Sequence, residues 1–311
     1  MAGFRTSDYR MKNLPDNWKE WAAALVRHGW AAPVALMLMA ATSAAQQASV
    51  RAPHVEARLI ASHTAVAPGT PVTVGLLLRM EKGWHTYWRN PGDAGMATSI
   101  VWELPAGAHA DSLRWPVPEL IGDPPEVTYG YGDFVMLQSV IHPPAGLAPG
   151  STFRIGCTAS WLVCREICLP GTAELALTLP VRAGPARADS LWNTVANSRQ
   201  CMFPNPPPRT GVTAQLHDST IDLHVLLKEM PVAAHAFRVQ FFAADEAVID
   251  HSAVQTFALS PTELAVSLRV SSFAPRPPRR LRGVLEVEGS TKVGMDTEID
   301  VPIVNVAKQA R

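Results

Sequence analysis

The chain has 311 residues and a formal net charge of zero, with 27 basic and 27 acidic side chains. This balance lacks the basic footprint of a nucleic-acid binder, so no nucleic-acid partner is expected. The length allows two domains, and 27 prolines among short apolar runs favour strands and turns over long helices. Four cysteines are too few for a disulfide-scaffolded small protein, but they allow one or two bridges in an exported one.

Residues 1–45 have the pattern of a signal peptide. A polar, basic stretch precedes a nearly pure apolar run over residues 30–41, and Ser43-Ala44-Ala45 offers a small-residue cleavage site. The apolar run is shorter than the roughly 20 residues that span a bilayer, and Pro33 disfavours a membrane helix. We expect export to an oxidising compartment, with an uncleaved amino-terminal anchor as the alternative.

Short apolar runs separated by turn residues predict a β-sandwich in the first half of the chain. The predicted strands cover residues 55–60, 72–78, 99–104, 134–141, 153–163 and 175–179. A helical, Pro-rich linker is predicted over residues 183–209, with Asp189 or Ser190 as the cap and Leu191, Val195 and Met202 near helical spacing.

A second set of strands follows the linker and has no cysteine and no cluster of titratable side chains that suggests a site. Alternation is clear from Ile221 to Val225, as in a half-buried strand. We predict a second β-sandwich over residues 210–307 with a scaffolding or docking role. Its strands are expected at residues 212–216, 221–227, 237–242, 264–270, 281–287 and 297–304.

Cys164 and Cys168 are the residues around which the first half is organised. On a straight strand, residues four apart are about 13 Å apart, whereas a disulfide needs Cα atoms within about 7 Å. If the two pair, the chain turns between them, with Arg165-Glu166 near the tip and Leu169-Pro170-Gly171 redirecting the chain into the next strand. A bridge that closes so small a loop removes little chain entropy, which favours redox use over a structural role.

The other two cysteines and a metal site are alternatives to a redox pair at Cys164 and Cys168. Cys157 shares an alternating face with apolar residues, so a small buried hydrophobe is expected. Cys201 is either free or bridged to Cys157. A zinc or copper site lacks a second ligand pair, and His85 and His142 are not at ligand spacing, so no metal and no cofactor are expected.

Two aromatic segments are further candidates. In the segment from Trp84 to Trp88, core packing is expected for both tryptophans. If the segment is a strand, His85 and Tyr87 are expected on its other face, where they are candidates to line a site. The segment from Tyr129 to Phe134 contains Tyr131 and is either a Gly-hinged loop covering the cysteine pair or a hairpin turn.

Together, these motifs resemble the periplasmic amino-terminal region of DsbD/ScsB-type thiol–disulfide interchange proteins. The resemblance rests on three blocks, Gly83-Trp84-His85-Thr86-Tyr87-Trp88 with Asn90-Pro91-Gly92-Asp93, Tyr129-Gly130, and Trp161-Leu162-Val163-Cys164 with Ile167-Cys168-Leu169-Pro170. It implies an immunoglobulin-like redox domain over residues 50–182, in which Cys168 forms the mixed disulfide and Cys164 resolves it. The family also has a cap loop with a shielding aromatic, for which Tyr129 is the candidate.

The resemblance implies a periplasmic protein-disulfide reductase component whose partners are thioredoxin-like oxidoreductases. Full-length members continue into a membrane electron transporter and a thioredoxin-like domain, so a separate transporter acting in trans is expected here. Two alternatives remain open from the residues. One is a non-catalytic two-domain β-sandwich that binds a protein, with structural cysteines, and the other is a thiol metal-binding protein for copper stress.

Overall fold

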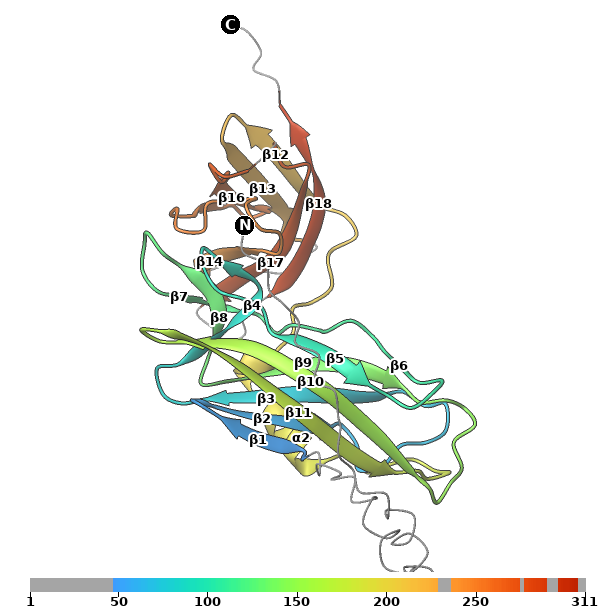
Figure 1. The fold of residues 1–311 in the computed structure, drawn as a ribbon. Helices are drawn as coiled ribbons and strands as arrows, with labels where there is room; N and C mark the ends of the chain where they lie inside the picture. The colour runs from blue at the N-terminus through green and yellow to red at the C-terminus, as the bar shows by residue number, and fades with distance from the viewer. Residues whose placement is uncertain (1–46, 229–235, 275–276, 290–295, 307–311) are drawn as a thin grey trace, which may run out of the picture. The chain divides into compact units, whose positions relative to one another are not determined.

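The computed structural model describes residues 47–228, 236–274, 277–289 and 296–306 (Figure 1). The expected signal peptide lies outside these residues. The described part is almost entirely β-structure, as the sequence predicted, with one short α-helix. Among the residues that the structure describes, no helix has the length and apolarity needed to cross a bilayer.

Two sheets form the first sandwich. The five-stranded sheet has the order β1 (Ser49–Ala52), β2 (Val55–Ala61), β3 (Val72–Met80), β9 (Phe134–His142) and β6 (His109–Ala110). The six-stranded sheet has the order β11 (Cys168–Pro180), β10 (Thr152–Cys164), β4 (His85–Gly92), β8 (Thr128–Gly132) and β7 (Glu119–Ile121), and β5 (Ser99–Glu103) pairs with β10. Both sheets contribute alternate side chains to one core, which is the arrangement expected of a sandwich.

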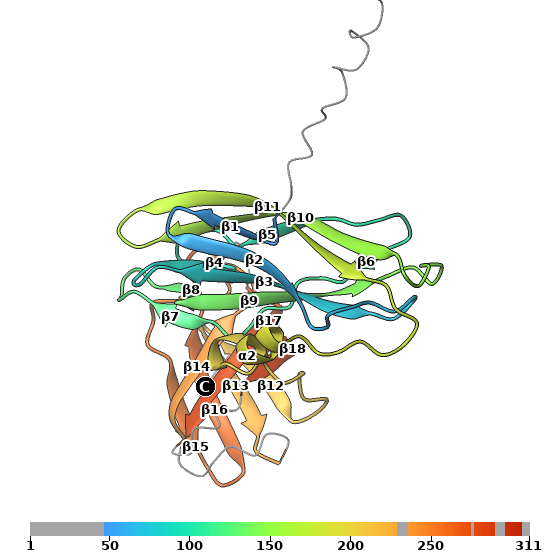
Figure 2. The same cartoon turned by 90° about the horizontal axis from the view of Figure 1, so that it is seen from below.

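The helix α2 (Ser190–Ala196) covers the outer face of the five-stranded sheet (Figure 2). Asp189 caps it by accepting a hydrogen bond from the Trp192 backbone N–H at 2.9 Å. Trp192 and Val195 are its buried residues, whereas Met202 is 51% exposed. The predicted helical spacing of Leu191, Val195 and Met202 is therefore wrong for Met202, because the α-helix ends at Ala196 and a 3₁₀ turn (Arg199–Cys201) follows.

The second half of the chain forms one seven-stranded sheet. Its order is β14 (Ala236–Ala243), β17 (Arg280–Gly289), β18 (Thr297–Asn305), β12 (Val212–His217), β13 (Thr220–Leu226), β16 (Glu263–Arg269) and β15 (Thr256–Leu259). The first part of β18 pairs with β17 and its last residues pair with β12. Buried side chains from both parts of the sheet form one core, so this region is also sandwich-like.

Two predictions about the elements near the cysteines are corrected. Leu169-Pro170-Gly171 does not redirect the chain, because β11 runs without a break from Cys168 to Pro180. Pro170 is tolerated there because β11 ends the order of its sheet. The segment from Thr128 to Gly132 is strand β8 rather than a loop, and the turn follows at Asp133.

Candidate functional site

A disulfide closes the hairpin between β10 and β11. Cys164 is the last residue of β10 and Cys168 the first of β11, and the two are direct cross-strand partners with Cα atoms 4.2 Å apart. Residues 165–167 form the turn, in which the Arg165 N–H donates to the Ile167 carbonyl at 3.2 Å. The chain therefore turns between the two cysteines, as their spacing requires if they pair.

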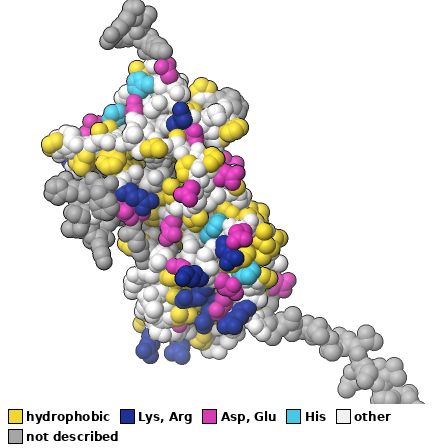
Figure 3. All heavy atoms as spheres, turned by 90° about the vertical axis from the view of Figure 1, so that its left-hand side faces the viewer, with side chains coloured by type: hydrophobic (Ala, Val, Ile, Leu, Met, Phe, Trp, Pro, Cys, Tyr) yellow, Lys and Arg dark blue, Asp and Glu magenta, His cyan; other side chains and the backbone are white. Residues whose placement is uncertain are grey.

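The two cysteines differ in accessibility. Cys164 is only 3% exposed, whereas Cys168 is exposed, and its neighbour Ile167 is 62% exposed. Figure 3 faces this end of the first sandwich and shows hydrophobic side chains beside charged and histidine side chains. A molecule that approaches the hairpin meets Cys168 before it meets Cys164.

The strand register places His85 and Tyr87 on the same face as the disulfide. His85 is the direct partner of Cys164 in the β4–β10 pair, and directly paired residues point to the same side of a sheet. Tyr87, two residues further along β4, shares that face. Its hydroxyl lies 3.6 Å from the Cys168 Sγ and donates to it, since a disulfide sulfur carries no proton. Both residues were predicted to line a site.

Tyr129 and Tyr131 lie on the opposite face of the same sheet. Gly130 and Gly132 of β8 pair with Tyr87 and His85, so Tyr129 and Tyr131, which alternate with these glycines, point into the core. Tyr129 packs edge-on against Phe242 and His251, and the Tyr131 hydroxyl donates to the Pro116 carbonyl at 2.8 Å. The structure thus brings His85 and Tyr87 to the disulfide, and it does not bring Tyr129 or Tyr131 there.

A glycine explains why β8 forms a strand beside β4. A Cβ on Gly130 would lie 2.2 Å from the Thr86 carbonyl oxygen, so only glycine permits this close pairing. Gly130 therefore serves the strand pairing, and together with Gly132 it leaves the outer face of β8 without side chains next to Tyr87 and His85.

Burial sets the protonation of the two residues beside the disulfide. It lowers the pKa of His85 below its usual value, so the imidazole is neutral at neutral pH. It raises the pKa of Tyr87, so the hydroxyl keeps the proton that it donates to Cys168. On the turn, Arg165 and Glu166 lie 3.8 Å apart and are exposed, so their charges largely offset each other.

A stack of side chains holds the tip of the hairpin. The Arg165 guanidinium lies 5.5 Å from the centre of the Trp84 ring. On Trp84, the His54 ring stacks at 3.8 Å, and His54 contacts Glu81 at 2.7 Å. The buried Trp84 therefore links the turn of the hairpin to the connection between β3 and β4.

The loop after β4 supports Tyr87, a role that sequence reasoning did not identify. Gly95 has a φ of +119°, and a Cβ there would lie 2.2 Å from the Tyr87 ring. The loop can pass this close to the ring only with glycine at that position. The sequence signal was the Gly-rich run after Pro91, but its partner could not be read from the chain.

The remaining two cysteines are free and buried, as expected for Cys157. Burial raises the pKa of the Cys157 thiol to about 12 and also raises the pKa of Cys201. Both thiols therefore stay protonated and unreactive in the folded protein.

Residues 56–180 match the family model described as the N-terminal region of thiol:disulfide interchange protein DsbD. The crystal structure of the N-terminal periplasmic domain of ScsB from Proteus mirabilis is similar, with a TM-score of 0.59 and 17% identity over 83% of this chain and 98% of that one. The yeast GGA1 GAE domain has a TM-score of 0.24 and 8% identity, covering 41% of this chain and 94% of that one. No curated protein matches.

Proposed function

Because residues 56–180 form a domain of the DsbD N-terminal type, we propose that the chain exchanges its Cys164–Cys168 disulfide with cysteine pairs of thioredoxin-like proteins in the periplasm. The observation that carries the proposal is the asymmetry of the pair, with Cys168 exposed at a hairpin end and Cys164 buried behind it. In this proposal residues 50–182 are the redox domain, residues 183–209 connect it, and residues 210–307 form a second domain.

The exchange proceeds through two thiol–disulfide displacements. In one direction, the Cys168 thiolate attacks a sulfur of the partner's disulfide and forms a mixed disulfide, and one partner sulfur leaves as a thiolate that takes up a proton. The Cys164 thiolate then attacks the Cys168 sulfur, which re-forms the Cys164–Cys168 bond and releases the second partner thiolate. Two electrons pass to the partner, and the reverse direction uses the same steps backwards.

The neighbouring side chains define what the domain contributes to each step. The Tyr87 hydroxyl is placed to donate to Cys168, which favours its thiolate when the pair is reduced. The neutral His85 supplies no positive charge to Cys164. With the exposed charges on the turn offsetting each other, the dithiol has ordinary reactivity and depends on the partner's activated cysteine for speed.

Trapping with a Cys164→Ser variant tests the proposal. This variant keeps the exposed Cys168 but cannot resolve the mixed disulfide, so we expect a covalent complex with a thioredoxin-like protein that reducing agent releases. Of the pair, the matched Cys168→Ser variant keeps only the buried Cys164, and it should trap little. The proposal fails if neither variant traps a partner, or if both trap the same amount.

A redox titration separates exchange from a structural role. We expect Cys164 and Cys168 to titrate as one two-electron couple in dithiothreitol or glutathione buffers. A Cys164→Ser/Cys168→Ser variant that keeps full function and loses only stability would instead support a structural bridge.

A further inference from the structure

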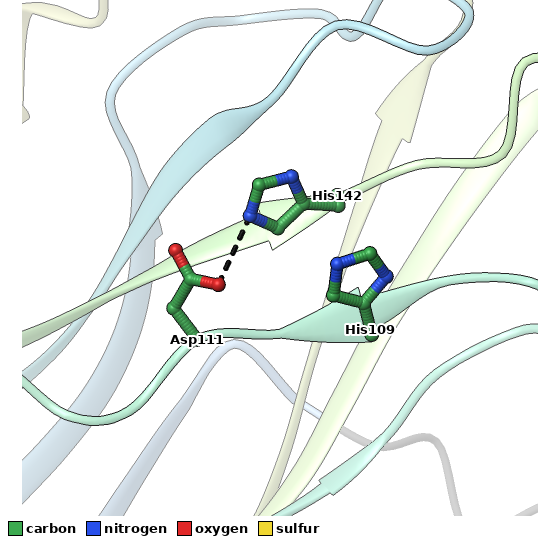
Figure 4. Close-up of side chains that lie close together, drawn as sticks. All are labelled: His109, Asp111 and His142. Atoms are coloured by element: carbon green, nitrogen blue, oxygen red, sulfur yellow. Dashed lines mark hydrogen bonds and ion pairs between the residues drawn. The ribbon is translucent and has the colours of Figure 1, made fainter.

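A cluster of three potential metal ligands lies on the edge of the five-stranded sheet (Figure 4). His109 and His142 are direct cross-strand partners between β6 and β9, so both side chains point to the same side. Asp111, two residues after His109, also lies on that side. The nitrogen and oxygen atoms that these residues offer lie within 4.8 Å of one another.

The backbone at the cluster is held in place by β9. The Asp111 N–H donates to the Val140 carbonyl at 2.9 Å, and the Ser139 hydroxyl donates to the Asp111 carbonyl at 2.7 Å. The two imidazole rings stack with centroids 4.4 Å apart and an interplanar angle of 4°. The three side chains therefore converge because of strand pairing, and their backbones need no rearrangement to bind one metal ion.

We propose that His109, Asp111 and His142 bind a divalent transition-metal ion, with Zn²⁺ as the best fit. Two imidazoles and one carboxylate, without sulfur, suit borderline divalent ions rather than Cu(I) or Ca²⁺. Three protein ligands plus one water is a common zinc arrangement.

The distances agree with such a site. Two ligand atoms at about 2.0–2.1 Å from a tetrahedral zinc ion are roughly 3.3 Å apart. The His142 Nε2 and the Asp111 Oδ1 are already 3.1 Å apart. His109 is exposed, so rotation of its side chain can bring its nitrogen from within 4.8 Å to coordination distance.

Other histidine–carboxylate pairs in the described residues are useful for comparison. His224 and Glu263 lie 2.9 Å apart, and the His224 side chain is as exposed as that of His142, at 32%. Among the residues that the structure describes, no third histidine, cysteine or carboxylate joins this pair to complete a three-ligand group. It therefore serves as a matched control, with similar chemistry but one ligand fewer.

The cluster is at the opposite end of the sandwich from the disulfide. Strand β9 begins at Phe134, next to the turn between β3 and β4. The first residue of β4 after that turn, His85, pairs with Cys164. The other end of β9 is His142, at the metal-ligand cluster (Figure 1). Metal binding at His142 therefore does not require the cysteines. This separates the proposal from a thiol metal site at Cys164 and Cys168.

Isothermal titration of the untagged, disulfide-bonded full-length chain with zinc chloride tests the site. We expect one Zn²⁺ per chain. His109→Ala and His142→Ala should each weaken binding at least about tenfold, and Asp111→Asn should also weaken it. His224→Ala and Cys164→Ser/Cys168→Ser should bind zinc as the unmodified chain does.

The proposal is overturned if the unmodified chain binds no zinc, or if binding persists unchanged in His109→Ala and His142→Ala. It is also overturned if binding is lost when the two cysteines are replaced. Thermal unfolding without zinc serves as the folding control. Because the His109 side chain is exposed, His109→Ala keeps the test valid even if His142→Ala proves unstable.

Discussion

The middle and the end of β10 give the same side chain two different chemistries. Cys157, in the middle, is fully buried in the core between the sheets, and its pKa is raised to about 12. Cys164, at the end, lies an odd number of residues further on, so it points to the other face, where it pairs with Cys168, the cysteine that the Tyr87 hydroxyl contacts. Position and face in the strand, rather than the residue type, separate an inert thiol from a candidate redox pair.

Alkylation of the reduced, folded protein is the most direct test of the difference in reactivity between Cys157 and Cys168. At about pH 8, iodoacetamide should modify Cys157 at least about 1,000-fold more slowly than Cys168, because Cys157 is both buried and protonated. Mass spectrometry of timed samples measures both rates. In urea, all four cysteines should react at similar rates, and similar rates in the folded protein would contradict the comparison.

Gly171→Ala tests how tightly the hairpin packs near its disulfide end. A Cβ on Gly171 would lie 2.5 Å from the Nε1 of its cross-strand partner Trp161, which is fully buried. We expect a loss of about 1–3 kcal/mol in the free energy of unfolding, measured with urea. Gly184→Ala, where a Cβ meets no atom within 4 Å, should be nearly neutral. Equal stabilities of the two variants would show that Trp161 can adapt.

Tyr87→Phe tests how the Tyr87 hydroxyl affects the reactivity of Cys168 at the end of the hairpin. The variant removes the hydroxyl that lies 3.6 Å from the Cys168 sulfur and keeps the ring that packs against Gly95. Losing a donor that favours the thiolate should slow alkylation of Cys168 about 2–5-fold at neutral pH. Cys157 alkylation should not change in the same samples. An unchanged Cys168 rate would mean that this hydrogen bond does not act on the reduced pair.

The smallest expected effect is a pH dependence from His85. Burial lowers its pKa in the folded state, so protonation favours the unfolded state. Its contribution to stability is therefore complete above the unfolded pKa of about 6.5 and is lost as the pH falls through and below that value. Urea midpoints between about pH 8 and about pH 5 should fall less in His85→Gln than in the unmodified chain.

Much of the first half was predictable because it follows local rules. Alternating apolar residues located β10, and the reach of an extended chain required a turn if Cys164 and Cys168 pair. Strand alternation also separated His85 and Tyr87 from the two tryptophans of the same strand. These inferences need only the periodicity and rise per residue of a single strand and the Cα–Cα distance that a disulfide allows.

The remainder depends on register between distant strands, which a single sequence does not contain. Tyr129 was the candidate for a shielding aromatic, but its pairing with β4 turns it into the core and leaves glycines beside the disulfide. His109 and His142 are 33 positions apart and become neighbours only when β6 pairs with β9. No spacing rule for metal ligands would have found them.

The outer edge of β11 has a consequence for how molecules of this protein meet one another. An unpaired strand edge is a template for adding strands of another chain, which leads to aggregation. Further along β11, Ala176 donates to the Gln47 carbonyl, so that part of the edge is already occupied. Beside the disulfide, Pro170 has no N–H to offer. The hairpin can therefore present Cys168 to a partner while this edge of β11 disfavours edge-to-edge pairing with the sheet of another molecule.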